Sequence, residues 1–350
     1  MSRVLFLNDN SAHENWGAQA TPPSLKMILN DSIKGCQLSI LSHSWLSRSF
    51  QHRLNDRFGG RYFRASDIHW RLRPLVFKFS RKVRFYPEVI DDFDYWADRW
   101  LKGDCGPHSK DFLDLARESD IVVYNGENSL YRNTPEGCHG LFLLYLAKTR
   151  LNKPACLVNH TSHFNEVKPI LRSMALKVYP QLDLVAVRES ASKANLESIG
   201  IHRVESFPDV AFYQSPDDSS PERVEEFLMR SSLKPNEFFC LSASGLPASM
   251  PRGEYDGEIT KLVRRLKQKT GLQSVLVAKD PWCLPLKDVA ERTGSVFFGP
   301  EYRYQDLWHL FRESNHLITG HYHYAIFAAM VGCPFVPLSV NNHKMRGLCE

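Results

Sequence analysis

The sequence has no Cys-x-x-Cys pair, although it contains 8 cysteines in 350 residues. That absence argues against a zinc ribbon and against a thioredoxin-type redox motif. Several cysteines stand in apolar runs, such as Cys156 in ACLV and Cys240 in FFCL. Buried free thiols are the simplest explanation, and they suit a reducing compartment. We therefore expect no metal site.

Two glycine-rich signatures are also missing. Neither G-x-G-x-x-G nor G-x-x-x-x-G-K-[ST] occurs anywhere in the chain. These loops hold the phosphates of dinucleotides and nucleoside triphosphates against backbone N–H groups. Their absence disfavours a dinucleotide enzyme and a P-loop nucleotidase, and no cofactor is expected.

Long apolar runs are absent too. No stretch approaches the 18 consecutive apolar residues of a membrane-spanning helix. The apolar run in the N-terminal MSRVLFLNDN is too short for a secretory signal. We expect a cytoplasmic protein, with contact at the inner face of the membrane as an option.

Positive charge is concentrated in one segment. The formal net charge is +5, and residues 48–84 hold eleven Lys or Arg residues against two acids, with aromatic residues between them. One interpretation is a solvated basic face over a local apolar cluster. Another is a surface that meets a phosphorylated or lipid-linked acceptor at a membrane. Nucleic acid is not an expected partner, because no recognised binding motif accompanies the segment.

Short apolar runs alternate with longer amphipathic stretches over most of the chain, which is typical of parallel α/β sheets. Strands are predicted at residues 4–7, 37–41, 120–124, 155–159, 184–187, 203–206, 238–241, 274–278, 296–298, 317–319 and 335–338. Residues 21–29 are predicted as part of a helix, with Pro22 and Pro23 tolerable only in its first turn.

The predicted fold is therefore α/β, with two Rossmann-like domains whose parallel sheets face a cleft. Residues 1–213 are predicted as the first domain, with an irregular basic and aromatic insertion at 44–112. Residues 214–236, rich in Ser, Pro and acid, are predicted as a linker with one short helix. Residues 237–350 are predicted as the second domain.

Polar residues directly after strands are the candidate site residues, because open α/β sheets bind ligands at the carboxyl ends of their strands. Glu127 follows the strand at 120–124, beside Gly126 and Asn128, as a general base or as a capping carboxylate. Asn15 and Gly17 stand where the chain enters a helix. They suit either anion binding at a helix N-terminus or a plain cap.

Arg188 directly follows four apolar residues, so its guanidinium is a candidate anion clamp, with an ion pair to Glu189, Asp209 or another acid as the alternative. His323 is a candidate for acid–base work near Gly320, His321 and Tyr322, while packing and metal ligation are alternatives. A metal site would need a third ligand, and no residue spacing near His321 and His323 supplies a convincing one. Ser244, after the strand at 238–241, joins the candidate substrate-binding residues.

Four stretches together resemble the polysaccharide pyruvyl transferase family: DLVAVRESASKANLESIGIHRVESFPDVAF (183–212), ITGHYHYAIFAAMVGCPFVPL (318–338), NWGAQA and NGEN. The resemblance covers the chain except residues 44–112. It implies a GT-B-like fold, with the acceptor side in the first domain and the donor side in the second, and transfer of the enolpyruvyl unit of phosphoenolpyruvate to two sugar hydroxyls. It also implies that Arg188 contacts the anionic donor and that His323 donates a proton or contacts the phosphate.

The chain departs from the family pattern at three positions. His321 stands where the family has Arg, Tyr322 where it has Leu, and Ala18 where an acid often follows the entry-loop glycine. A neutral His321 would hold an anionic donor less firmly than an arginine, which is always charged.

Three functions remain open at this point. The first is ketal pyruvyl transfer from phosphoenolpyruvate, the donor substrate, to a free or lipid-linked saccharide during surface or exopolysaccharide biosynthesis. The second is a GT-B glycosyltransferase with a nucleotide-sugar donor. The third is a non-catalytic protein that binds glycan or lipid. The oligomeric state is left open.

Overall fold

The computed structural model describes residues 2–13, 15–42, 86–87, 89–105, 107–127, 129–130, 135–164, 169–243, 252–279, 285–338 and 343–350. The basic segment at 48–84 and two candidate site residues, Asn128 and Ser244, lie outside these ranges. No helix within these ranges has the length and apolar character needed to cross a membrane.

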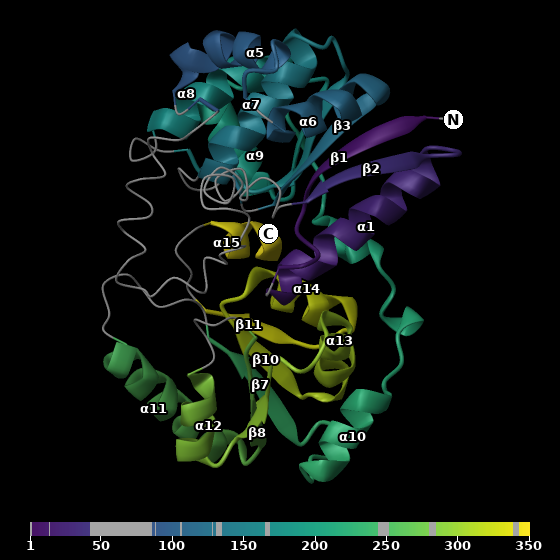
Figure 1. The fold of residues 1–350 in the computed structure, drawn as a ribbon. Coiled ribbons are helices and arrows are strands. Elements are labelled where there is room, and N and C mark those ends of the chain that lie inside the picture. Colours follow the sequence, from purple (N-terminus) through teal and green to yellow (C-terminus); the bar gives the residue numbers. More distant parts are fainter. Residues whose placement is uncertain are drawn as a thin grey trace, which may run out of the picture. The chain divides into compact units, whose positions relative to one another are not determined.

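The first sheet contains six parallel strands in the order β2-β1-β3-β4-β5-β6 (Figure 1). Its strands are β1 (Arg3–Asp9), β2 (Gln37–Ser42), β3 (Ile121–Glu127), β4 (Ala155–His160), β5 (Leu184–Val187) and β6 (Glu205–Ser206). The helices of this part are α5 (Phe93–Leu101), α6 (Pro107–Glu118), α7 (Pro135–Thr149), α8 (Pro169–Val178) and α9 (Ser190–Ser198). The central strands are buried along nearly their whole length, as parallel strands covered on both faces must be.

The second sheet contains five parallel strands in the order β11-β10-β7-β8-β9. Its strands are β7 (Phe238–Ser242), β8 (Gln273–Val277), β9 (Val296–Phe298), β10 (His316–Thr319) and β11 (Phe335–Pro337). Its helices are α10 (Glu222–Arg230), α11 (Arg252–Thr270), α12 (Leu286–Thr293), α13 (Tyr304–Glu313), α14 (Tyr322–Met330) and α15 (Lys344–Cys349). The predicted fold class, α/β with two Rossmann-like parallel sheets, is confirmed.

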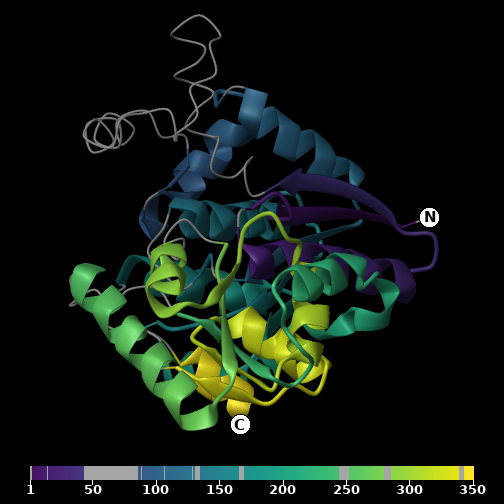
Figure 2. The same ribbon diagram turned by 90° about the horizontal axis from the view of Figure 1, so that it is seen from below.

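Alternation along β7 shows how the second sheet is covered. Phe239 and Leu241 join the apolar cluster formed with α11 and α12. Phe238 and Cys240 join the cluster formed with α10, α13 and α14. Successive side chains of a strand point to opposite faces, so one apolar run supports two helical layers. The helices α11 and α12 lie side by side over one face (Figure 1, Figure 2).

The chain divides into two compact units, of residues 1–10 with 29–207 and of residues 11–28 with 208–350. Helix α1 (Trp16–Ser32) therefore begins in the second unit and ends in the first. Trp16 is fully buried in the apolar core of the second unit, where its ring contacts Phe298 and Tyr324. The limits predicted above, 1–213 and 237–350, remain a prediction of the domain boundaries.

The predicted position of the prolines in α1 is wrong. The helix begins at Trp16, so Pro22 and Pro23 lie in its interior rather than in its first turn. A proline there removes a helical hydrogen bond, so other contacts must stabilise the helix. Asn15 caps its start, accepting from Ala18 N at 3.0 Å.

The prediction of an irregular segment over 44–112 is also wrong for its described end. Helix α5 and the start of α6 lie there. Trp100 of α5 is fully buried and packs edge-on against Phe112 of α6 and Phe142 of α7. These helices depend on aromatic packing between segments, and a local pattern does not reveal such packing.

Candidate active site

The order of strands marks one point in each sheet where a ligand is expected. In the first sheet, β1 lies between β2 and β3, and in the second, β7 lies between β8 and β10. Chain connections leave in opposite directions on the two sides of such a strand, which opens a crevice at the carboxyl ends. The residues that end β1, β3, β7 and β10 therefore define the candidate sites.

In the first unit, Glu127 ends β3 with a buried side chain. Its Oε2 accepts a hydrogen bond from Nδ2 of Asn10, which directly follows β1. Glu127 has a φ of 37°, and Asn8 and Asn159 at neighbouring strand ends have φ values of 65° and 55°. Non-glycine residues in this left-handed region carry strain, and such strain gathers at functional sites. A carboxylate in this position can accept a proton from a bound hydroxyl group.

Gly126 has a packing role beside Glu127. A Cβ atom there would lie 2.3 Å from Cβ of His160, so any larger residue would separate β3 from β4. His160 is itself fully buried, with Nδ1 3.2 Å from Ala186 O and Nε2 3.3 Å from Tyr179 Oη. Burial lowers the pKa of His160 to about 4. His160 is therefore a neutral structural residue at physiological pH.

Arg188, after β5, lies in a buried polar network of its own unit. Its side chain is 1% exposed, and its Nε donates to Thr161 Oγ1 at 2.9 Å and lies 3.6 Å from Glu189 Oε2. Glu189 in turn accepts from Ser192 Oγ, which accepts from Ser162 N at 2.7 Å. The ion pair with Glu189 is thus present, and contact of Arg188 with a donor stays a prediction.

In the second unit, His323 and Asp209 form a buried pair. His323 is the second residue of α14, and its Nε2 lies 3.4 Å from Asp209 Oδ2. Gly17, in the first turn of α1, lies against the imidazole ring. A Cβ atom at Gly17 would lie 2.1 Å from His323 Nδ1 and 2.4 Å from Cγ. Close approach of His323 therefore requires glycine at position 17.

His321 lies in the loop after β10, two residues before His323, but its contacts differ from those of His323. The backbone N–H of His321 donates to Thr319 Oγ1 at 2.9 Å, and its ring stacks on Tyr324 at 4.7 Å. Gly320 is buried, and its N–H donates to Ser242 O at the end of β7. This bond joins the carboxyl ends of β10 and β7.

Two further candidates have structural contacts as well. Asn15 caps α1 through Ala18 N, which is the capping alternative stated above. Tyr322 is buried, and the Lys344 ammonium lies 5.9 Å from its ring centroid. A substrate contact for Asn15 or Tyr322 stays a prediction.

Sequence reasoning did not select as site residues three polar residues in segments that follow strands: Asn10, Asp209 and Lys279. Lys279 follows the run of β8, donates to Gln19 Oε1 at 3.2 Å and lies 5.4 Å from the Trp16 ring centroid. It is the first polar residue after the apolar run VLVA, so it meets the criterion used above, a polar residue directly after a strand. Asp209 follows Pro208 after the short edge strand β6, where the signal is weaker.

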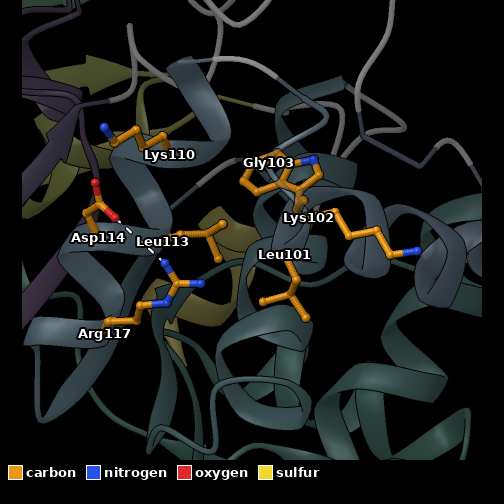
Figure 3. A pocket seen from close by; sticks show the side chains of 8 residues that line it. Leu101, Lys102, Gly103, Lys110, Leu113, Asp114 and Arg117 are labelled. Carbon is orange, nitrogen blue, oxygen red and sulfur yellow. Dashed lines mark ion pairs between the residues drawn. The ribbon is translucent and has the colours of Figure 1, made fainter.

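A pocket of about 560 Å³ lies elsewhere, between α5 and α6 (Figure 3). Trp100 and Leu113 line it together with Lys102 and Lys110, and Arg117 pairs with Asp114 at 3.7 Å. Helix α6 leads into the amino end of β3, so this pocket lies away from the strand ends that carry the candidate residues. Among the residues that the structure describes, no cluster of three or more His, Cys, Asp or Glu residues could hold a metal ion.

Several solved structures share this fold, and three of them contain UDP or a UDP-sugar. MnaA of S. aureus in complex with UDP is 12% identical, with a TM-score of 0.58 over 99% of this chain and 82% of that one. UDP-GlcNAc 2-epimerase of Neisseria meningitidis is 12% identical, with a TM-score of 0.56 over 99% and 85%. HepE of Anabaena with UDP-glucose is 14% identical, with a TM-score of 0.55 over 96% and 80%. At these identities the likeness shows the GT-B-like fold alone.

A curated set of proteins contains no match to the sequence. The polysaccharide pyruvyl transferase family matches residues 52–342, a range that includes Glu127, Arg188, Asp209 and His323. Asn15 and Gly17 precede the matched range. The match extends over most of the chain, and the chain therefore belongs to the polysaccharide pyruvyl transferase family.

Proposed function

We propose that this protein transfers a pyruvyl group from phosphoenolpyruvate to two hydroxyl groups of a saccharide, forming a cyclic ketal. Membership of the family supports the reaction class. The observation that carries the proposal is the position of His323, which lies in the first turn of α14, after the carboxyl end of β10, and pairs with Asp209. Histidine side chains serve as general acids and bases in many enzymes.

The reaction needs no electron transfer. A proton adds to the methylene carbon of phosphoenolpyruvate, and the adjacent carbon becomes oxocarbenium-like. A sugar hydroxyl attacks this carbon and loses its proton, and the carbon–oxygen bond to phosphate breaks. The second hydroxyl then attacks the same carbon and loses its proton. The products are the ketal and inorganic phosphate, so two hydroxyl protons end on the new methyl group and on the phosphate.

The strand-end residues supply the groups that these steps require. His323 is the proposed proton donor to the methylene carbon, or the contact for the phosphate. Glu127, oriented by Asn10, is the proposed base for the attacking hydroxyl. Arg188 is the proposed contact for the anionic donor, and Lys279 adds a cation after β8.

Phosphate release tests the proposal directly. The purified protein is incubated with phosphoenolpyruvate and with free or lipid-linked oligosaccharides, and the products are examined by mass spectrometry. We expect phosphate release that depends on the acceptor, together with a ketal product. Glu127→Gln should fold normally and lower kcat by about 10²- to 10⁴-fold. Absence of release with every acceptor, together with turnover of a nucleotide sugar, would reject the proposal.

One observation favours a second candidate, glycosyl transfer from a nucleotide sugar. His321 replaces the expected arginine, and its ring stacks on Tyr324 rather than presenting a permanent charge. Thermal-shift measurements with UDP-, GDP- and CMP-sugars and with phosphoenolpyruvate separate the candidates, because a ligand of the folded state raises Tm. A shift with phosphoenolpyruvate alone supports pyruvyl transfer, and a shift with one nucleotide sugar alone supports glycosyl transfer.

A further inference from the structure

We propose that Asn10 is the positioning residue of Glu127, holding the carboxylate that acts as base toward the attacking sugar hydroxyl. The hydrogen bond from Asn10 Nδ2 to Glu127 Oε2 is the contact that carries this inference. Both residues belong to the first unit, although they are 117 positions apart in sequence. The inference rests on the proposed function, since it specifies how Glu127 would be kept in place for the transfer.

An irregularity in β1 brings the Asn10 amide to this position. The pairing of β1 with β2 shifts between Leu7 and Asp9, so Asn8 is an extra residue in β1. Asn8 has a φ of 65°, in the left-handed region that asparagine enters more readily than most residues. A bulge of this kind re-aims the side chains that follow it, and bulges are common beside active sites. The bulge at Asn8 therefore determines where the Asn10 amide points.

Beyond the bulge, asparagine side chains connect β1 to β3. The backbone pairing of these two strands runs as far as Tyr124 of β3. After it, Asn8 Nδ2 donates to Asn125 O at 2.6 Å. The Asn10 amide forms the next link, to the Glu127 carboxylate. The carboxylate is therefore joined to the end of β1 by a side-chain bond.

The backbone of Glu127 is held from the opposite side, by the end of β4. Glu127 lies opposite His160 in the register of β3 and β4, and Thr161 N donates to Glu127 O at 2.9 Å. With its backbone fixed by β4 and its side chain fixed by β1, the carboxylate has little freedom. A reacting group that is held in place before the reaction saves the cost of orienting it during the reaction.

The chemistry of the pair determines how the Asn10 amide lies. A carboxylate accepts hydrogen bonds and donates none, so the NH₂ group of Asn10 faces Glu127. The other atom of the amide, Oδ1, is buried, and none of the residues that the structure describes donates a hydrogen bond to it. A buried acceptor without a donor disfavours folding. Asn10 thus carries a cost in stability, as residues that serve a functional site commonly do.

A double-mutant cycle with Asn10→Leu and Glu127→Gln tests the inference in the full chain. Leucine has nearly the shape of asparagine but no donor, so the carboxylate loses its bond while the volume is kept. We expect Asn10→Leu to lower kcat by about 10- to 10²-fold, with KM for phosphoenolpyruvate nearly unchanged, because a misplaced reacting group costs about this much. In the Glu127→Gln background the same substitution should change kcat less than about threefold, since residues that act as a unit are not additive.

Tyr145→Phe is the matched control. It removes another donor to a carboxylate of the first unit, the bond of 2.6 Å from Tyr145 Oη to Asp94 Oδ1. This substitution should leave kcat unchanged in both backgrounds. Equal effects of Asn10→Leu on kcat in the two backgrounds, or a large fall in its urea midpoint with unchanged kcat, indicate a structural role and overturn the inference.

NMR of the asparagine side chains separates failure of the inference from failure of the proposed function. The NH₂ signals of Asn10, assigned by their loss in Asn10→Leu, should shift in Glu127→Gln and stay in place in Tyr145→Phe. Signals that do not respond to Glu127→Gln overturn the inference even if pyruvyl transfer is observed. A response without pyruvyl transfer to any acceptor supports the pairing and rejects the proposed function. If Asn10→Leu does not fold, Asn10→Ser replaces it in the assignment and in the cycle.

Discussion

Gly17 and His323 approach so closely that a Cβ atom on the glycine would lie 2.1 Å from Nδ1 of the histidine. The two residues come from opposite ends of the chain, yet both belong to the second unit. Their contact joins the first turn of α1 to the first turn of α14. The close packing against His323 therefore requires a glycine in NWGAQA. This steric requirement is separate from the anion binding that its loop suggests.

The contact predicts the effect of Gly17→Ala. The added methyl group must displace the imidazole or the α1 backbone, and overpacking of this kind costs about 1–3 kcal/mol of unfolding free energy. Urea unfolding measures this loss, and kcat should fall because His323 moves. Gly257→Ala in α11 is the control, since a Cβ there meets nothing within 4 Å. Alanine at 257 should be neutral or stabilise by up to about 1 kcal/mol. Equal stability of the two variants would contradict the contact.

Trp16→Ala should destabilise the second unit selectively. The indole is fully buried there, and its Nε1 donates to Tyr302 O at 3.0 Å. Loss of a buried tryptophan costs about 3–5 kcal/mol. Hydrogen exchange should show protection lost in β7 and β8 before it is lost in β3. Met229→Ala is the control. This residue is 76% exposed, so the substitution should change neither the stability of the second unit nor the exchange pattern. Loss of protection in β3 alone would argue against the assignment of Trp16 to the second unit.

Because His160 is buried, we expect the free energy of unfolding to fall in mild acid. Burial lowers its pKa to about 4 in the folded state, against about 6.5 in an unfolded chain. The unfolded state therefore binds more protons below pH 6.5, and the stability contributed by the neutral ring is lost as pH falls toward 4. This residue alone should lower the unfolding free energy by about 2 kcal/mol between pH 7 and pH 5.

Urea unfolding across that pH range measures the effect, and His160→Gln should show a shallower dependence. An NMR titration of His160 offers an independent check. A midpoint near the ordinary histidine value would show that the ring is not held neutral by burial.

His321→Arg should tighten binding of phosphoenolpyruvate if that compound is the donor. A guanidinium is always charged, and a hydrogen bond to a charged group contributes about 1.5–3 kcal/mol. KM for phosphoenolpyruvate should fall about tenfold or more, while His321→Gln should not lower it. A KM that stays constant for phosphoenolpyruvate but changes for a nucleotide sugar would favour glycosyl transfer.

Much of the fold could be predicted because each buried strand is one short apolar run. The runs at 238–241 and 317–319 match β7 and β10 to within one residue at each end. Helices α5 and α6 were not predictable in this way, because their stability comes from Trp100 and its distant aromatic neighbours. The start of α1, ahead of its interior prolines, was not predictable either, because its residues pack in tertiary contacts, such as the bond from Gln214 Nε2 to Ala20 O at 2.8 Å.

The search for polar residues directly after strands located Glu127 and His323, but it did not locate their partners Asn10 and Asp209. Asn10 was missed because the first strand was predicted to end at Leu7, whereas β1 continues to Asp9 through the left-handed Asn8. Asp209 was missed as a partner of His323, because its pairing with α14 joins residues far apart in sequence. Pairing of this kind depends on the fold, and a local pattern contains no information about it.

The place of Trp16 in the core of the second unit has a consequence for biosynthesis. Its hydrogen-bond partner Tyr302 is 286 residues further along the chain. At about 5–20 residues per second, a ribosome needs roughly 15–60 s to make that stretch. During that time the start of α1 has emerged without the strands that enclose its indole. The start of α1 can therefore be enclosed only after the strands of the second unit and Tyr302 have been made.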